Sequence, residues 1–194
     1  NIQDNCSKAM GLAFITVDYK GIPITKYSGF TSHCMLGRQA KGFAEMCEQC
    51  DAHGGLYAAI TGQPYIYRCH AGLVDFAVPL IVNGSYMGAV LGGQVRLQEE
   101  SERELEHILP QRPNWKRDKE WEEAYQKLEV VTYEKVEASV KLLRDIIVTF
   151  VERRTGKGAD GVLREKEKQI QADLFDHIVT RGGNYTVVEL IEKY

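Results

Sequence analysis

The alternation of apolar and polar positions predicts a strand-rich first half of the chain. An alternating β-branched run, a turn-forming Asp-Tyr-Lys-Gly sequence and a second short apolar run predict a β-hairpin over residues 13–25. Three further apolar runs, at 65–69, 73–82 and 85–97, are strand-like, and the Asn-Gly pair between the last two is a strong hairpin signal. We therefore expect five strands, the last three of which form a meander.

Helical spacing of apolar residues marks the segments between and after these runs. Residues 32–53 contain no Pro and have apolar side chains at helical intervals, which predicts one helix that stops at Gly54-Gly55. Between residues 118 and 154 apolar side chains recur at threes and fours, which predicts one long amphipathic helix with a dimer seam that includes Leu143.

The order of these elements is typical of one α+β architecture. A hairpin, a helical segment and then a three-stranded meander is the order of a PAS- or GAF-like sensor, with helices over one face of the sheet. We expect a PAS-like antiparallel five-stranded sheet with flanking helices and a long C-terminal helix.

Length and glycine content suggest one domain followed by an extension. A chain of 194 residues fits one sizeable domain, and three glycines between residues 155 and 161 indicate a hinge. We expect a sensory domain over 1–154 and a helical linker over 155–194 that leads to a further domain outside this sequence. The chain begins without Met and ends in the middle of a pattern, so we expect it to be part of a longer protein.

Charge and hydropathy exclude two classes of partner for these residues. The net charge is −3 with Lys and Arg spread along the chain, so no basic surface for nucleic acid is expected. The apolar runs are far shorter than the roughly 20 residues that cross a membrane. Any DNA-binding part is expected to lie elsewhere, and no membrane contact is predicted.

Five cysteines suggest free thiols and raise the question of a metal site. An odd number in a domain of this size argues against a disulfide framework and favours a reducing compartment, here the cytoplasm. Soft thiolates bind zinc, iron or an iron–sulfur cluster, and the alternative is a thiol-lined core or pocket. On a single helix Cys34 and Cys47 would occupy different faces, so all four candidates meet only if that helix breaks. The candidate metal ligands are Cys34, Cys47, Cys50 and Cys69.

Polar side chains within the strand-rich part predict a small pocket. Imidazole, carboxylate and amide groups both donate to and accept from hydroxyls, which suits a small alcohol. The alternative for single residues is that His70 caps a turn and that Asp75 faces solvent. The pocket candidates are Tyr67, Cys69, His70, Asp75 and Gln94, with Phe43, Phe76 and Met87 as an apolar lid.

Catalysis has little support in the sequence. Cys69 and His70 are adjacent, and adjacent residues on a strand point to opposite faces, so no nucleophile–base pair is expected. The chain also has no phosphate-binding loop, no H-E-x-x-H and no G-x-S-x-G. We therefore expect a protein that is not an enzyme.

Several short motifs resemble the PocR sensory-domain family over about residues 5–150. The motifs are Cys47-Glu-Gln-Cys-Asp51, Tyr67-Arg-Cys-His-Ala-Gly-Leu73, Asp75-Phe-Ala-Val-Pro79 and Gly92-Gly-Gln-Val95, preceded by Cys34. The resemblance implies a PAS variant that senses small hydrocarbon derivatives such as propanediols. It also implies an AraC-type DNA-binding domain, or another output domain, elsewhere in the protein.

The resemblance and the pocket argument together define the expected function. We expect a ligand-sensing domain of a transcription regulator for 1,2- or 1,3-propanediol, glycerol or a related alcohol, acting as a homodimer through its long helix. The alternative is a cysteine-ligated metal or redox sensor. The expected ligand-binding residues are Cys34, Phe43, Cys47, Tyr67, Cys69, His70, Asp75 and Gln94.

Overall fold

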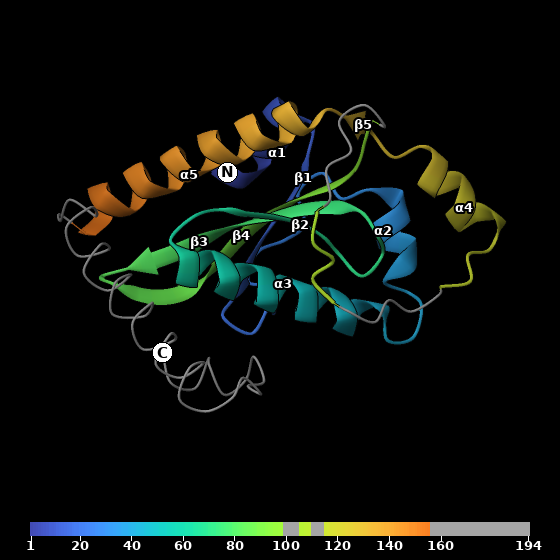
Figure 1. Ribbon diagram of the computed structural model, residues 1–194, viewed down its shortest axis with the longest axis horizontal. Helices are drawn as coiled ribbons and strands as arrows, with labels where there is room; N and C mark the ends of the chain where they lie inside the picture. Colours follow the sequence, from blue (N-terminus) through green and yellow to red (C-terminus); the bar gives the residue numbers. More distant parts are fainter. Residues whose placement is uncertain (99–104, 110–114, 156–194) are drawn as a thin grey trace.

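A five-stranded sheet with helices on both faces forms the described part of the chain (Figure 1). The computed structural model describes residues 1–98, 105–109 and 115–155. Within these residues the elements are α1 (Ile2–Met10), β1 (Ala13–Asp18), α2 (Ser32–Gly37), α3 (Phe43–Thr61), β2 (Tyr65–Arg68), β3 (Val74–Val82), β4 (Ser85–Leu97), α4 (Lys119–Gln126), β5 (Val130–Val131) and α5 (Tyr133–Thr155). The predicted linker over 155–194 lies almost wholly outside the described residues and stays a prediction.

Four antiparallel strands in the order β1-β4-β3-β2 make up most of the sheet, and β5 pairs in parallel with the end of β4. The Asn83-Gly84 hairpin is confirmed, because both residues have the positive φ values, 52° and 76°, that a tight two-residue turn needs. The expected α+β class, five-stranded sheet and long C-terminal helix are also confirmed.

Alternate side chains of the strands pack into two separate hydrophobic cores, one on each face of the sheet. Phe14 packs with residues of α1 and α5 on one face, while its neighbour Ile15 packs with residues of α2 and α3 on the other. This alternation follows from the pleat of a strand. Helices therefore cover both faces of the sheet, so the expectation of helices over one face is wrong.

The prediction of a second strand in an N-terminal hairpin is wrong. β1 pairs with β4, and the segment after the turn makes two isolated bridges to β1, Val17–Pro23 and Phe14–Ser28, without forming a strand. Asp18 holds the turn by accepting hydrogen bonds from the backbone N–H groups of Lys20 and Ile22. Pro23 has no N–H group to donate, which interrupts a continuous ladder along this edge of β1.

The predicted helix over 32–53 is two helices, and Gly54-Gly55 does not stop the second one. α2 ends at Gly37, and α3 begins at Phe43 and continues to Thr61. A Cβ atom on Gly54 would lie 2.5 Å from the ring of Tyr67. The two glycines therefore allow α3 to lie close on the sheet rather than end it.

The predicted long helix over 118–154 is also two helices, with β5 between them. The N–H groups of Arg96 and Gln98 donate to the carbonyl groups of Glu129 and Val131, so this segment completes the sheet edge. Leu143 of the predicted seam is 3% exposed and packs on the protein's own sheet. The homodimer stays a prediction, but Leu143 does not form an exposed seam.

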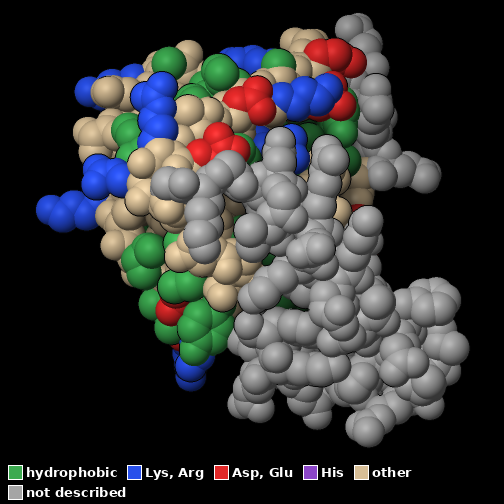
Figure 2. Space-filling model, turned by 90° about the vertical axis from the view of Figure 1, so that its left-hand side faces the viewer, with side chains coloured by type: hydrophobic (Ala, Val, Ile, Leu, Met, Phe, Trp, Pro, Cys, Tyr) green, Lys and Arg blue, Asp and Glu red, His purple; other side chains and the backbone are tan. Residues whose placement is uncertain are grey.

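Two further sequence expectations can be compared with the described surface. Figure 2 shows basic and acidic side chains interspersed with neutral ones on the face in view. Among the described residues no helix combines the length and the apolar character that a membrane crossing requires.

Candidate ligand-binding site

A small cavity lies between the sheet and the helices α2 and α3. Its volume is about 40 Å³, which is room for about three water molecules. The space therefore suits a molecule of only a few heavy atoms. The lining residues are Ala13, Ile15, Phe30, Cys34, Arg38, Phe43, Cys47, Cys50, Asp51, Cys69, His70, Ala71, Asp75, Leu91, Gly92 and Gln94.

The fold brings most of the predicted ligand-binding residues into this one cavity. Those that line it are Cys34, Phe43, Cys47, Cys69, His70, Asp75 and Gln94. Tyr67 does not, because it is fully buried under Gly54 of α3. The predicted lid is wrong for Phe76, which packs against Phe14 in the opposite core, and for Met87, which is 56% exposed.

A β-bulge turns Gln94 toward the cavity. Val74 pairs with Val95 and Asp75 pairs with Gly93, so Gln94 is the extra residue in β4. Its φ of 61° lies in the left-handed region, which is a strained conformation for a side chain of this kind. The surrounding contacts hold it there, as expected at a functional position.

Gln94 joins the sheet to the start of α2. Its backbone N–H donates to Asp75 Oδ1 at 2.8 Å. Its side-chain Oε1 accepts from the N–H and the hydroxyl of Thr31, at 2.9 and 3.0 Å, and Thr31 is the N-cap of α2. One residue therefore links a cavity carboxyl on β3 with the helix that forms the opposite wall.

Two carboxyl groups face the cavity from different walls. Burial raises the pKa of Asp75 on β3 to about 6, although hydrogen bonds from the Gln94 backbone and the Cys69 thiol act in the opposite direction. Burial, and then the nearby Asp75, raise the pKa of Asp51 on α3 well above its usual range. Desolvation disfavours the charged form of an acid, so burial shifts Asp51 toward its neutral form.

His70 lies between two of the thiols. Its ring Nδ1 accepts a hydrogen bond from the Trp115 indole at 3.1 Å, and its Nε2 lies 3.3 Å from Cys47 Sγ. Its backbone N–H donates to Cys50 Sγ at 3.4 Å. Burial, and then Arg38, lower the pKa of His70 to about 4. A neutral ring that accepts at Nδ1 carries its proton at Nε2, so His70 donates to Cys47.

This arrangement does not activate a thiol. Burial raises the pKa of Cys34 to about 12 and raises that of Cys47, Cys50 and Cys69 further. The expectation that Cys69 and His70 point to opposite faces is wrong, because β2 ends at Arg68 and both residues line the cavity. His70 nevertheless contacts Cys47 as a donor, and a donor cannot remove the thiol proton.

The four candidate metal ligands share the cavity. The break between α2 and α3 is what allows Cys34 to join the others, as the spacing required. Within the described ranges no three His, Cys, Asp or Glu side chains are placed to hold a metal ion together. A cysteine-bound metal stays a prediction of the sequence.

Sequence reasoning missed some cavity residues. Asp51 ends the Cys-x-x-Cys-Asp motif, so the signal for it was present. Arg38 lies in the break after α2, where its guanidinium stacks 5.2 Å from the Tyr27 ring and 5.5 Å from the Phe30 ring. No periodic pattern identifies such a residue, because its position depends on where the helix ends.

A small cavity between a sheet and two helices, lined by a few polar groups, is typical of domains that bind small molecules. Residues 1–155 match the family model described as the sensory domain found in PocR, so the chain belongs to the PocR sensory-domain family. This family is described by sensing rather than by catalysis.

A curated relative supports the same assignment. The chain is 37% identical over 153 residues to the regulatory protein PocR of Salmonella typhimurium strain LT2. The match covers 79% of this chain and 50% of the relative, so the chain spans about half the length of that protein. No solved structure matches the chain.

Proposed function

We propose that this domain senses a small neutral diol or a related alcohol, such as 1,2-propanediol, 1,3-propanediol or glycerol. The observation that carries the proposal is the cavity itself, which is small and combines hydrogen-bonding side chains such as His70, Asp75 and Gln94 with apolar surface. The family match to a sensory domain and the likeness to a regulatory protein support it.

The chemistry of the cavity suits hydroxyl groups. A hydroxyl both donates and accepts, so it pairs with a carboxyl, an imidazole or an amide without bringing a charge into a buried space. Asp75 and Gln94 offer such groups on the sheet side, and Phe43 and Leu91 offer apolar surface for a short carbon chain. A ligand larger than a few heavy atoms would not fit without movement of α2 or α3.

The signal would leave the cavity along β4. Just after Gln94, the end of β4 pairs with β5, and α5 begins two residues after β5. A ligand that favours one arrangement at Gln94 would thus change the position of α5 relative to the sheet. We infer that α5 continues toward an output domain, of AraC type, that binds DNA in a cytoplasmic protein.

The proposed homodimer would use the exposed side of α5. Leu142 is 52% exposed and Phe150 is 45% exposed, and they lie two helical turns apart on one side of the helix. Residues 156–194 follow directly from the end of α5. Pairing two copies along this stripe would bring their following segments together.

A thermal-shift panel tests the ligand proposal. A ligand that binds only the folded state raises the melting temperature as its concentration increases. At a concentration 100 times its Kd, it adds about 2.7 kcal/mol to the free energy of unfolding. We expect a rise with one or two short diols and not with sodium chloride at the same concentration. No rise across the panel, in a sample with one zinc or iron atom per chain, would instead support the cysteine-ligated metal sensor.

A further inference from the structure

We propose that Asp51 anchors a hydroxyl group of the ligand and that, with Asp75 on the opposite wall, it makes the cavity select molecules with two hydroxyl groups over mono-alcohols. This inference rests on the proposed function and assigns its specificity to one residue pair. Neither residue of the pair has a binding role in the family description or in the name of the relative.

Asp51 is a buried carboxyl without a hydrogen-bond partner among the described residues. It is 8% exposed and lines the cavity from the third turn of α3. No hydrogen bond contributes to its pKa, whereas Asp75 accepts from the Gln94 backbone at 2.8 Å. Buried polar groups nearly always have a partner, because leaving one unpaired costs about 1–3 kcal/mol. The Asp51 carboxyl is therefore available to pair with a molecule in the cavity.

The two carboxyl groups lie on different walls. Asp51 comes from α3 and Asp75 from β3, and both contribute to the surface of the same cavity. They are close enough for the charge of Asp75 to disfavour that of Asp51, since Asp75 is a cause of the raised pKa of Asp51. A molecule that fills the space between them meets one carboxyl at each end.

Two hydroxyl groups satisfy this arrangement and one does not. A diol places one oxygen at Asp51 and the other at Asp75, while a mono-alcohol of the same length leaves one carboxyl facing a methyl group. A site that is built to hydrogen-bond a hydroxyl rejects a ligand that lacks it more strongly than a site rejects a ligand of slightly different shape. The neutral form of Asp51 donates to a ligand oxygen, and its carbonyl oxygen accepts from a ligand hydroxyl.

Titration calorimetry on the 194-residue protein tests the proposal, with 1,2-propanediol and 1-propanol as probes. The key variant is Asp51→Leu, which keeps a branched side chain of similar size and removes both the donor and the acceptor. The matched control is Glu45→Met, the same kind of change at an exposed position in the first turn of the same helix. Melting temperatures without ligand are measured for all three proteins.

We expect the unaltered protein to bind the diol at least tenfold more tightly than 1-propanol. Asp51→Leu should lose at least tenfold in diol affinity, so that its affinities for the diol and for 1-propanol approach each other, while Glu45→Met behaves as the unaltered protein. Without ligand, Asp51→Leu should melt no lower than the unaltered protein, because the variant no longer buries a carboxyl group.

The possible failures are distinguishable. If the unaltered protein binds neither probe, the diol-sensing function fails and the inference fails with it. If Asp51→Leu keeps the affinity for the diol and the preference over 1-propanol, the role of Asp51 is overturned and the proposed function stands. A melting temperature that falls by several degrees in Asp51→Leu alone would show that Asp51 stabilises the fold rather than anchoring a ligand.

Discussion

At the scale of single residues, burial disfavours the charged forms of the carboxyl and imidazole groups in this domain, which raises the pKa of the acids and lowers that of the histidines. The pKa of Asp75 is raised to about 6, so its contribution to stability is lost as the pH rises from about 4 through 6. The pKa of His70 is lowered to about 4, so its contribution is lost as the pH falls from 6.5 toward 4. The two effects oppose each other at mildly acidic pH.

His33 allows the effect of a buried histidine on stability to be measured separately, because this residue lies outside the cavity. It is 1% exposed, its ring packs against Trp121 and Tyr125, and burial is the main cause that lowers its pKa from 6.5 to about 4. Below pH 6.5 the unfolded state binds the proton first, so native stability is lost there. We predict that His33→Leu removes this loss.

The measurement is urea unfolding of the unaltered protein and of His33→Leu at pH 7.5 and pH 5. Relative to the unaltered protein, the variant should gain about 2 kcal/mol between these two pH values, since one pKa unit corresponds to about 1.4 kcal/mol. Any constant packing cost of the leucine cancels in this difference. An equal difference in stability at both pH values would contradict the lowered pKa.

The site residues that the sequence identified are those that carry distinctive chemistry inside recognisable motifs. His70, Asp75 and the cysteines were found because such groups are uncommon in a strand-rich core. Arg38 could not be found, because its place in the cavity depends on the end of α2. Tyr67 does not line the cavity, because it is buried under α3, and the sequence pattern does not show which segment covers a buried residue.

At the scale of elements, the contact of α3 with the sheet gives the cavity its dimensions. Gly54 allows that contact, since a Cβ atom there would overlap the Tyr67 ring at 2.5 Å. In an exposed helix an alanine is about 1 kcal/mol more favourable than a glycine. At this buried position we predict the opposite effect. Gly54→Ala should lower the free energy of unfolding by about 1–3 kcal/mol, because the added methyl group overpacks the contact with Tyr67.

Urea unfolding checks this prediction. The control is Gln49→Ala, an exposed position on the same helix, which should change stability by no more than about 0.5 kcal/mol. A Gly54→Ala protein as stable as the control would show that α3 does not depend on this close contact.

Local patterns predicted the strands better than the helices. The Asn83-Gly84 hairpin was predictable because its turn chemistry is entirely local. The breaks at Gly37 and between α4 and α5 were not, because they depend on contacts with distant segments, such as the pairing of β5 with β4. Helical spacing alone does not distinguish one long helix from two shorter ones in line.

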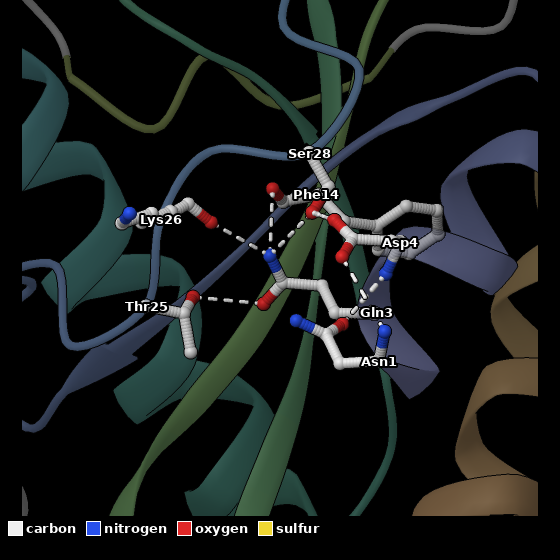
Figure 3. Close-up of polar contacts among 7 residues, drawn as sticks. All are labelled: Asn1, Gln3, Asp4, Phe14, Thr25, Lys26 and Ser28. Atoms are coloured by element: carbon white, nitrogen blue, oxygen red, sulfur yellow. Dashed lines mark hydrogen bonds and ion pairs between the residues drawn. The ribbon is translucent and has the colours of Figure 1, made fainter.

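The N-terminal helix α1 is also fixed by contacts that no local pattern predicts. Figure 3 shows Gln3 at the centre of a network, where its amide donates to the carbonyl of Lys26 and accepts from the Thr25 hydroxyl. Ser28 donates to Asp4 in the same network. These bonds hold the segment that leads to Phe30, a residue of the cavity wall, against α1.

At the scale of the whole molecule, α5 has two different sides. Leu143 is buried on the sheet, while its neighbour Leu142 is 52% exposed. We predict that Leu143→Asp unfolds the domain, since it places a charge in the core at a cost of several kcal/mol. Leu142→Asp should fold normally and, by the proposed use of the exposed stripe, should sediment as a monomer.

Circular dichroism and sedimentation velocity of the two variants check this pair. A folded Leu143→Asp protein would contradict the packing of α5 on the sheet. A Leu142→Asp protein that remains a dimer would contradict the proposed dimer surface and leave the fold unaffected.

The most direct test of a diol-sensing cavity is a crystal structure of the protein with 1,2-propanediol, with anomalous data to identify any metal. The account predicts one diol between α3 and β3, with its two oxygens within hydrogen-bond distance of Asp51 and Asp75. A diol bound only elsewhere, or a metal ion held by the cysteines in the same space, would contradict it.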